Sequence, residues 1–199
     1  ITVVDHDRVD LTNLQRQVIH ELAGVGQPKA LSAAQRIAAI NPEVRVEALV
    51  ERADAAHLDA LVRAADVVLD CSDNFATRHA VNRACVAHRV PLVSGAAIRF
   101  DGQISVYDSR DPACPCYACL FPEEAAFEEV RCATMGVFAP LVGIIGTVQA
   151  AEALKILSGM GSQLAGRLLM LDGRALSWTD IRIQRDPACP VCGTRCTGA

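Results

Sequence analysis

Aromatic residues are scarce in this sequence, because Phe, Trp and Tyr together make up only 4% of its 199 residues. The hydrophobic residues, 51% of the chain, are therefore mostly Ala, Val, Leu and Ile. These side chains favour buried strands wrapped by helices over an aromatic binding surface. The length is sufficient for one sizeable core, and we expect a single domain over residues 1–199.

Further absences exclude whole classes of function. The sequence has no basic run and a net charge of −4, from 19 basic and 23 acidic residues, so we expect no nucleic-acid partner. No apolar stretch reaches the roughly 18 residues of a membrane span, because the apolar residues 137–148 are too few and contain Pro140 and glycines. We therefore expect no membrane segment. The N-terminus also lacks the basic start and cleavage site of a signal peptide.

Strand and helix patterns alternate through the first half of the chain. We expect strands over residues 1–5, 44–48, 67–70 and 91–95, and helices over 28–40, 55–65 and 75–88. This alternation predicts a parallel sheet with crossover helices. In the second half we expect a strand over 102–108, a long apolar helix over 140–158 and a hairpin of strands 168–172 and 177–183. The fold class is therefore α/β, a Rossmann-like nucleotide-binding fold whose mixed sheet is parallel first and antiparallel later.

Nine cysteines are present, and four of them form two Cys-x-x-Cys pairs, Cys116/Cys119 and Cys189/Cys192. Each pair has the spacing that presents two thiolates to one metal, and two pairs supply a closed four-thiolate site of the kind that holds structural Zn²⁺. Cys114 is also close in sequence, but the matched spacing favours Cys116 and Cys119. We expect the zinc to join the C-terminal tail to the mid-chain loop.

Two independent redox or free-thiol pairs are the alternative interpretation of these cysteines. A disulfide framework is a device of small secreted domains with poor cores, and this chain has ample apolar residues for a core. A reducing compartment fits better, so we expect a cytoplasmic protein. Cys71 and Cys85, predicted on a core strand and a helix, are interpreted as packing residues.

Polar residues follow the predicted strands at the places where open α/β sheets bind ligands. Asp5 ends the first strand, as does the acid that holds ribose hydroxyls in nucleotide-binding βαβ units. Arg16 and Lys29 can neutralise phosphate charge, Lys29 at the start of a helix. Asp73, followed by Asn74, lies after the strand 67–70 and offers a carboxylate to Mg²⁺.

Each of these residues also has a structural interpretation. Asp73 can simply cap the helix that begins at Phe75. Lys29 can be a solvated surface lysine, and Asp5 and Asp7 can be ordinary loop acids. Their joint occurrence at the expected places favours the functional interpretation.

The motifs in order resemble one family. They are Asp5-x-Asp7, Asn13-Leu-Gln-Arg16-Gln17, Gly26-Gln-Pro-Lys29, Leu69-Asp-Cys-Ser-Asp73-Asn74, Pro91-Leu-Val-Ser-Gly95-Ala-Ala and the two Cys-x-x-Cys pairs. The chain resembles the ThiF/MoeB/HesA family, relatives of ubiquitin-activating enzymes, over nearly all its residues. The likeness is nearest to the members that act on molybdopterin synthase.

The resemblance implies an adenylyltransferase. ATP and Mg²⁺ would activate the C-terminal glycine of a small β-grasp sulfur-carrier protein ending in Gly-Gly, and a sulfur-donor enzyme would then supply sulfur for a thiocarboxylate in molybdopterin or thiamine biosynthesis. Asp5 would hold the ribose, and Lys29 would meet the triphosphate. Asn13, Gln15 and Arg16 would line the phosphates, and Asp73 with Asn74 would lie at the metal and phosphate.

Three further expectations come from the same resemblance. Cys132 corresponds to a cysteine that takes part in sulfur transfer in some members and is dispensable in others, and it follows an acidic segment like the family's mobile crossover segment. A homodimer is expected. The family's Gly-x-Gly-x-x-Gly turn would precede residue 1, so we expect an N-terminally truncated form of the domain, with its first βα unit missing.

Other functions stay open at this point. A HesA-like or tRNA-modifying relative would activate a different carboxylate, although the acidic net charge disfavours tRNA. A non-catalytic, zinc-stapled dimerisation module would explain the missing glycine turn, but the retained Arg16, Lys29 and Asp73 argue against it. A metal-free redox protein would follow from the alternative interpretation of the cysteines.

Overall fold

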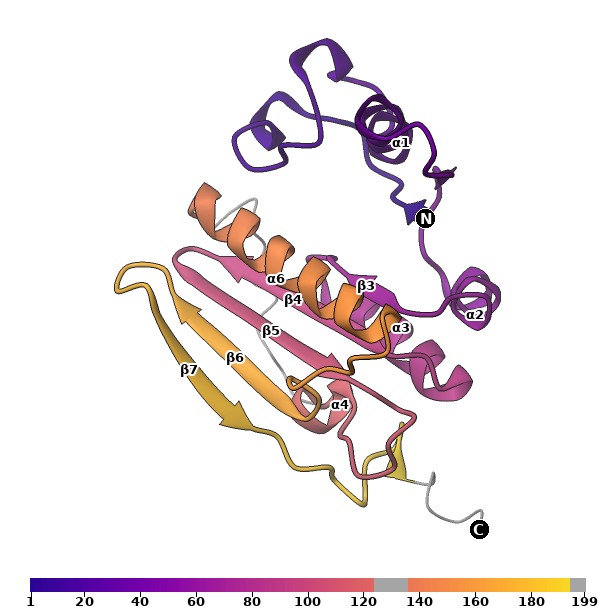
Figure 1. Cartoon of the computed structure of the whole chain (residues 1–199), viewed down its shortest axis with the longest axis vertical. Helices are drawn as coiled ribbons and strands as arrows, with labels where there is room; N and C mark the ends of the chain where they lie inside the picture. Colours follow the sequence, from indigo (N-terminus) through magenta and orange to yellow (C-terminus); the bar gives the residue numbers. More distant parts are fainter. Residues whose placement is uncertain (124–135, 194–199) are drawn as a thin grey trace. The chain divides into compact units, whose positions relative to one another are not determined.

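A computed structural model of the protein describes residues 1–123 and 136–193. The chain divides into two compact units, Ile1–Asp54 and Ala55–Ala199, each of which is described by itself. Figure 1 shows the order of their helices and strands. Cys132 and nearly all of the acidic segment before it lie outside the described residues, so the predictions for them stay predictions. The prediction of one domain over residues 1–199 likewise stays a prediction.

The first unit is a βαβ arrangement. Strand β1 (Thr2–Val4) pairs in parallel with β2 (Glu47–Leu49), and Val3 lies opposite Ala48. Between them come two 3₁₀ turns, η1 (Leu11–Asn13) and η2 (Leu22–Gly24), and helix α1 (Lys29–Ile40). Parallel strands need such a crossover connection. The helix begins at Lys29, one residue later than predicted, because Pro28 is its N-cap rather than its first helical residue.

The second unit contains a five-stranded sheet in the order β3-β4-β5-β6-β7. Its first two strands, β3 (Val68–Asp70) and β4 (Leu92–Ile98), are parallel, and helix α3 (Phe75–His88) connects them. The remaining pairs are antiparallel and involve β5 (Asp101–Tyr107), β6 (Arg167–Asp172) and β7 (Ser177–Arg182). The prediction of a mixed sheet, parallel first and antiparallel later, is confirmed.

Helices cover this sheet. Helix α6 (Ala139–Leu157) lies along β4 and β5 (Figure 1) and buries one face against them. Val93, Ile104 and Val106 from the sheet meet Ala153 and Ile156 from the helix in one core cluster. Helix α2 (Ala55–Arg63) packs against α3. A short helix, α4 (Tyr117–Leu120), lies in the stretch around Cys116 and Cys119 that was predicted as a mid-chain loop.

Helix α6 corrects the expectation about apolar length. Its 19 residues, with a mean hydropathy of 1.4, make it the one helix in the described residues that is long and apolar enough to cross a membrane. The buried face against β4 and β5 contains Gln149 and Glu152. One side of α6 therefore belongs to the core of this unit, while Leu154 and Leu157 on the same helix are exposed.

Strand β4 also differs from its prediction. It was expected to end at Gly95, but it continues through Ala96 and Ala97 to Ile98. Small residues have low strand propensity, so no strand signal marks this part of β4 in the sequence. The glycine at residue 95 makes room for Gln149 on α6, because a Cβ atom there would lie 2.4 Å from the side-chain amide of Gln149, which would have to shift.

Candidate metal centre and nucleotide site

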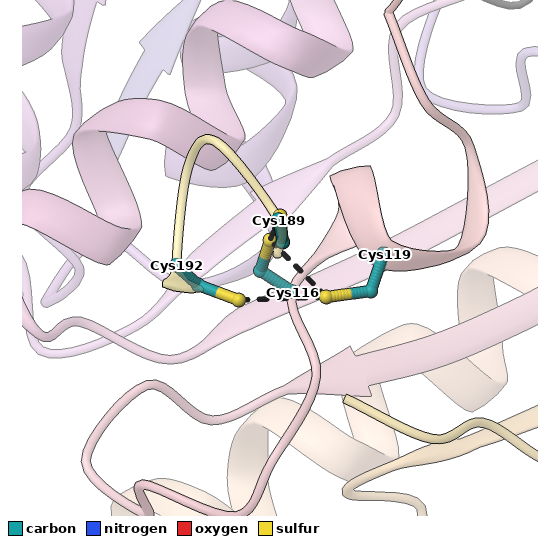
Figure 2. A group of neighbouring side chains, drawn as sticks. All are labelled: Cys116, Cys119, Cys189 and Cys192. Atoms are coloured by element: carbon teal, nitrogen blue, oxygen red, sulfur yellow. Dashed lines mark hydrogen bonds between the residues drawn. The ribbon is translucent and has the colours of Figure 1, made fainter. Parts of the chain in front are cut away.

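The four cysteines of the two Cys-x-x-Cys pairs come together in the second unit. Figure 2 shows their side chains gathered around one point, two from the segment that begins α4 and two from the C-terminal loop. Each offers a sulfur atom within 4.8 Å of the others. The measured Sγ–Sγ distances are 4.0 Å for Cys116–Cys119, 3.7 Å for Cys116–Cys189 and 3.4 Å for Cys119–Cys192.

These distances fit a tetrahedral metal. Four sulfur atoms at about 2.3 Å from a central Zn²⁺ lie about 3.8 Å from one another, and the thiols are free rather than joined as disulfides. Cys114 is excluded from the group, since its Sγ atom instead accepts a hydrogen bond from the Asp108 amide at 3.3 Å. The predicted choice of Cys116 over Cys114 is therefore supported by the geometry.

The surroundings of the cluster prepare it to bind a cation. A hydrogen bond from the Cys116 thiol lowers the pKa of Cys119, and the same bond with burial raises the pKa of Cys116. The bond therefore favours the thiolate form of Cys119, and thiolates are the metal-binding form of cysteine. Asn82 on α3 donates to Cys116 Sγ at 3.7 Å and accepts from the Tyr117 amide at 2.9 Å.

The first unit contains five of the residues predicted to bind a nucleotide, together with Asp7. Asp5 follows β1, and its Oδ1 atom accepts from the Asp7 amide at 2.8 Å. Lys29 Nζ donates to Asp7 Oδ2 at 2.9 Å, and this hydrogen bond lowers the pKa of Asp7. Asp5 and Asp7 with His6 also place possible metal-ligand atoms close together. Asp7 is already paired with Lys29, and the group is solvent-accessible, so it gives no independent sign of a metal.

The remaining predicted residues of the first unit lie on the 3₁₀ turn η1 or just after it. Asn13 is buried, and its Oδ1 atom accepts from the Asp10 amide at 3.1 Å as half of a capping box. Arg16 is half-buried and donates to the Thr12 carbonyl at 3.2 Å, whereas Gln15 is exposed. Asn13 is thus part of the turn that presents Gln15 and Arg16.

The second unit contains Asp73 and Asn74, directly before α3. Asn74 is the N-cap of α3, since its side chain accepts from the Thr77 amide at 2.8 Å. The alternative interpretation, in which Asp73 caps this helix, is therefore wrong. Asp73 is exposed after the carboxyl end of β3, where its carboxylate is accessible to a cation such as Mg²⁺.

The structure adds residues that the sequence interpretation missed. Arg78 on α3 is buried and donates to the Ser72 carbonyl after β3 and to the Gly95 carbonyl on β4, and Gln149 on α6 donates to the carbonyls of Asp70 and Val93. A signal for Arg78 was present in the sequence. Helical spacing places it on the face of Val81, Asn82 and Cys85, all of which are buried.

The two remaining assigned cysteines behave differently from each other. Cys85 is buried, as predicted for a packing residue, and burial raises its pKa to about 12. Cys71 was assigned the same role on a core strand, but the strand ends at Asp70 and Cys71 lies in the following loop. Its placement on the strand is therefore wrong; although the residue is exposed overall, its thiol lies 3.7 Å from Gln149 Oε1, and burial raises the pKa of that thiol.

The elements described above define a Rossmann-like α/β protein with a mixed sheet. In fold the chain is similar to the crystal structure of Escherichia coli MccB with ATP, with a TM-score of 0.82 and 22% identity over 97% of this chain and 59% of that one. The sequence profile of the ThiF family matches residues 1–191. The chain belongs to the ThiF family.

Two relatives show how close the relationship is. The chain is 45% identical to the molybdopterin-synthase adenylyltransferase of Escherichia coli (strain K12) over 196 residues, which are 97% of this chain and 77% of that protein. It is also 45% identical to the sulfur carrier protein adenylyltransferase of Thermus thermophilus over 197 residues, which are 97% of this chain and 73% of that protein.

Proposed function

We propose that this protein catalyses ATP-dependent adenylylation of the C-terminal glycine carboxylate of a small β-grasp sulfur-carrier protein. The product prepares the carrier for thiocarboxylate formation in molybdopterin or thiamine biosynthesis. The observation that carries the proposal is the 45% identity to two relatives named for this type of activity. This chain retains polar residues of the required chemistry after β1, on η1, at the start of α1 and after β3.

The reaction needs positioning and charge neutralisation more than a general base. A carboxylate oxygen of the carrier attacks the α-phosphorus of ATP, the bond from that phosphorus to the bridging oxygen breaks, and pyrophosphate leaves. Lys29 and Arg16 offset the negative charge of the phosphates, while Asn13 and Gln15 orient them. Asp5 holds the ribose.

Lys29 changes partner when the nucleotide binds. In the structure its ammonium group is paired with the Asp7 carboxylate. The phosphates of ATP carry more negative charge than this one carboxylate, so they attract the ammonium group more strongly. The pair with Asp7 keeps Lys29 beside the N-terminus of α1, where backbone N–H groups also favour an anion.

Asp73 with Asn74 would hold the Mg²⁺ ion. The fit rests on the exposed carboxylate of Asp73, an oxygen ligand of the type that Mg²⁺ prefers. When bound, the ion neutralises phosphate charge. Asn74 contributes by its capping bond to Thr77, which fixes the backbone that presents Asp73.

The four cysteines would hold a structural Zn²⁺ that joins the C-terminal segment to α4. The sulfur geometry supports this assignment, and four protein ligands leave no open position for substrate. We further propose a homodimer in the cytoplasm, a sulfur-donor enzyme as second partner, and no role for nucleic acid or a membrane. The thiol-rich composition supports a reducing compartment. A role for Cys132 in sulfur transfer stays a prediction.

ATP–pyrophosphate exchange with a β-grasp carrier ending in Gly-Gly tests the proposed function. Two forms would be assayed, the 199-residue chain and the same chain preceded by the glycine-rich strand–turn–helix of the family. We expect carrier-dependent exchange that Asp73→Ala abolishes. Asp66→Ala is the matched control, since Asp66 is also an exposed aspartate at one end of β3.

The outcome separates the competing functions. If neither form exchanges with any carrier, the adenylylation proposal is wrong for carrier proteins. Exchange with a small carboxylate would then favour a HesA-like activity, and no exchange at all would favour a non-catalytic zinc-stapled module.

A further inference from the structure

Arg78 is a buried cation in the second unit. It lies on α3, one helical turn after Asn74, and is only 6% exposed. A buried guanidinium is costly unless each of its donors finds an acceptor, so its partners indicate what it does. Those partners come from the carboxyl end of β3 and the loop after it, and from the middle of the neighbouring parallel strand β4.

On the β3 side the guanidinium holds the segment that leads to Asp73. Its Nη2 atom donates to the Ser72 carbonyl, and its Nη1 atom lies 3.8 Å from Asp70 Oδ2. Asp70 is itself buried, and its Oδ1 atom accepts from the Ser72 amide at 2.9 Å and from the Ser72 hydroxyl at 2.7 Å. Both the amide and the carbonyl of Ser72 are therefore fixed.

On the β4 side the same group reaches the next strand. Nη2 also donates to the Gly95 carbonyl at 3.2 Å, and Nη1 donates to Ser94 Oγ at 3.4 Å. The planar, forked guanidinium thus spans β3 and β4 with donors in several directions. One residue thus links the middle of β4 to the loop after β3.

We propose that Arg78 is a positioning residue for Asp73. It holds the Ser72 carbonyl immediately before Asp73, while the Asn74 cap holds the backbone immediately after it. Asp73 is left as the exposed residue between two anchored neighbours. The inference rests on the proposed function, because the fixed carboxylate is the one assigned to Mg²⁺ and the phosphates.

Lysine cannot replace arginine in this role. Its single ammonium group lacks the planar fork, so it cannot serve the Ser72 carbonyl and the acceptors on β4 together. We expect Arg78→Lys to release the Ser72 carbonyl and to raise amide hydrogen exchange at residues 72–74 roughly tenfold, the change expected for losing one charge-assisted hydrogen bond. The Mg²⁺ concentration for half-maximal pyrophosphate exchange should rise by roughly the same factor.

The control is Arg63→Lys on α2, because Arg63 is exposed and pairs only with the neighbouring Asp59 in the contacts described. We expect it to change neither measurement. The KM for ATP at saturating Mg²⁺ should stay within roughly twofold in both variants, since Arg78 acts through the metal ligand. If Arg78→Lys does not fold, Ser94→Ala removes one acceptor of the guanidinium and should shift both measurements in the same direction by roughly two- to threefold.

The outcomes are distinct from those for the proposed function. If amide exchange at residues 72–74 is unchanged in Arg78→Lys, the positioning role is overturned. If the loop loosens but the Mg²⁺ dependence stays the same in an active enzyme, Arg78 is merely structural and the role is also overturned. If neither the 199-residue chain nor the form preceded by the glycine-rich unit shows pyrophosphate exchange, the proposed function fails, and amide exchange alone then decides whether Arg78 fixes the backbone at Asp73.

Discussion

The four-cysteine cluster and the residues predicted to bind a nucleotide differ in how far the fold itself assembles them. The cysteines all belong to the second unit, and their sulfur atoms already lie at metal-binding distances. The predicted nucleotide residues belong to both units, and most have local partners. Lys29 is paired with Asp7, Asn13 caps a turn and Asn74 caps a helix.

The difference follows from the chemistry of the side chains. Thiols are weak hydrogen-bond donors and acceptors, so a buried cysteine side chain mainly packs against its neighbours, ionises or binds a metal. Charged and amide side chains instead form hydrogen bonds or ion pairs with the nearest donor or acceptor. A cysteine cluster with metal-binding geometry is therefore recognisable in the fold, while the residues predicted to bind a nucleotide act in the structure as caps and ion-pair partners.

The largest expected effect comes from breaking the cluster with Cys192→Ser. Cys192 is fully buried, and structural zinc sites contribute directly to folding. We expect zinc content to fall from one per chain to none and the second unit to lose roughly 3 kcal/mol or more of stability. Elemental analysis and thermal melting measure both.

The matched control is Cys71→Ser, since the Cys71 thiol lies outside the cluster and the residue is exposed. Its zinc content should equal that of the parent. If the parent chain contains no zinc and its clustered thiols form reversible disulfides, the metal assignment is wrong and the redox interpretation of the two pairs replaces it.

A smaller loss is expected where α6 meets the strand ends that lead to Asp73. In Gly95→Ala the new methyl group would collide with Gln149, whose amide donates to Asp70 and Val93. We expect a loss of about 1–3 kcal/mol, the range for overpacking a core. Gly143→Ala on α6 is the control, because a Cβ atom there meets nothing within 4 Å. That change should be neutral or stabilising, and equal effects of the two variants on chemical denaturation would contradict this explanation.

Sequence reasoning succeeded where local signals agreed. Helix α3 was predicted over residues 75–88 and occupies Phe75–His88, since a cap precedes it and Pro91 follows soon after. The grouping of the four cysteines was predicted from spacing alone, because the two pairs match each other. The outer half of β4 was missed, since its small residues are explained only by Gln149 on a distant helix.

The nucleotide residues show the limit of such reasoning. The sequence offered Asp73 as a possible cap of the helix that begins at Phe75, and the hydrogen bond from the Thr77 amide shows that Asn74 is the cap instead. The long-range role of Arg78 depends on where β4 lies, which no pattern around α3 reveals. Local patterns specify which residue types are present, while partners distant in sequence decide what those residues do.

Asp7→Asn tests whether an ion pair competes with nucleotide binding in the first unit. The pair with Lys29 is partly exposed, so its loss should cost less than about 1 kcal/mol of stability. Freed from Asp7, Lys29 should bind phosphate more readily, and we expect ATP to bind a few-fold more tightly by calorimetry. Glu21→Gln, which removes the exposed pair with Arg36 on the same helix, is the control. Weaker ATP binding in Asp7→Asn alone would indicate that Asp7 itself contacts the nucleotide.

The smallest effect on stability is expected at His79, which lies between the helix start after Asp73 and the segment that contains Cys116. Its ring stacks on Phe75, near Asp73 in sequence, and meets the edge of Tyr117, next to Cys116. Burial lowers the pKa of His79 below its ordinary value of 6.5. The unfolded chain therefore binds a proton more readily, so stability is fully present above about pH 6.5 and declines as the pH falls.

Replacing this histidine removes its part of the pH dependence. In His79→Phe, which keeps a ring between Phe75 and Tyr117, the melting temperature should fall less between about pH 7 and pH 5.5 than in the parent. His6→Gln alters an exposed histidine of the first unit and should leave the slope unchanged. Melting in excess zinc keeps the cysteine cluster loaded over this range, so that thiol protonation does not dominate the slope. If the melting temperature of His79→Phe depends on pH as steeply as that of the parent, protonation of His79 is not linked to folding. His79 would then contact Phe75 and Tyr117 through packing alone.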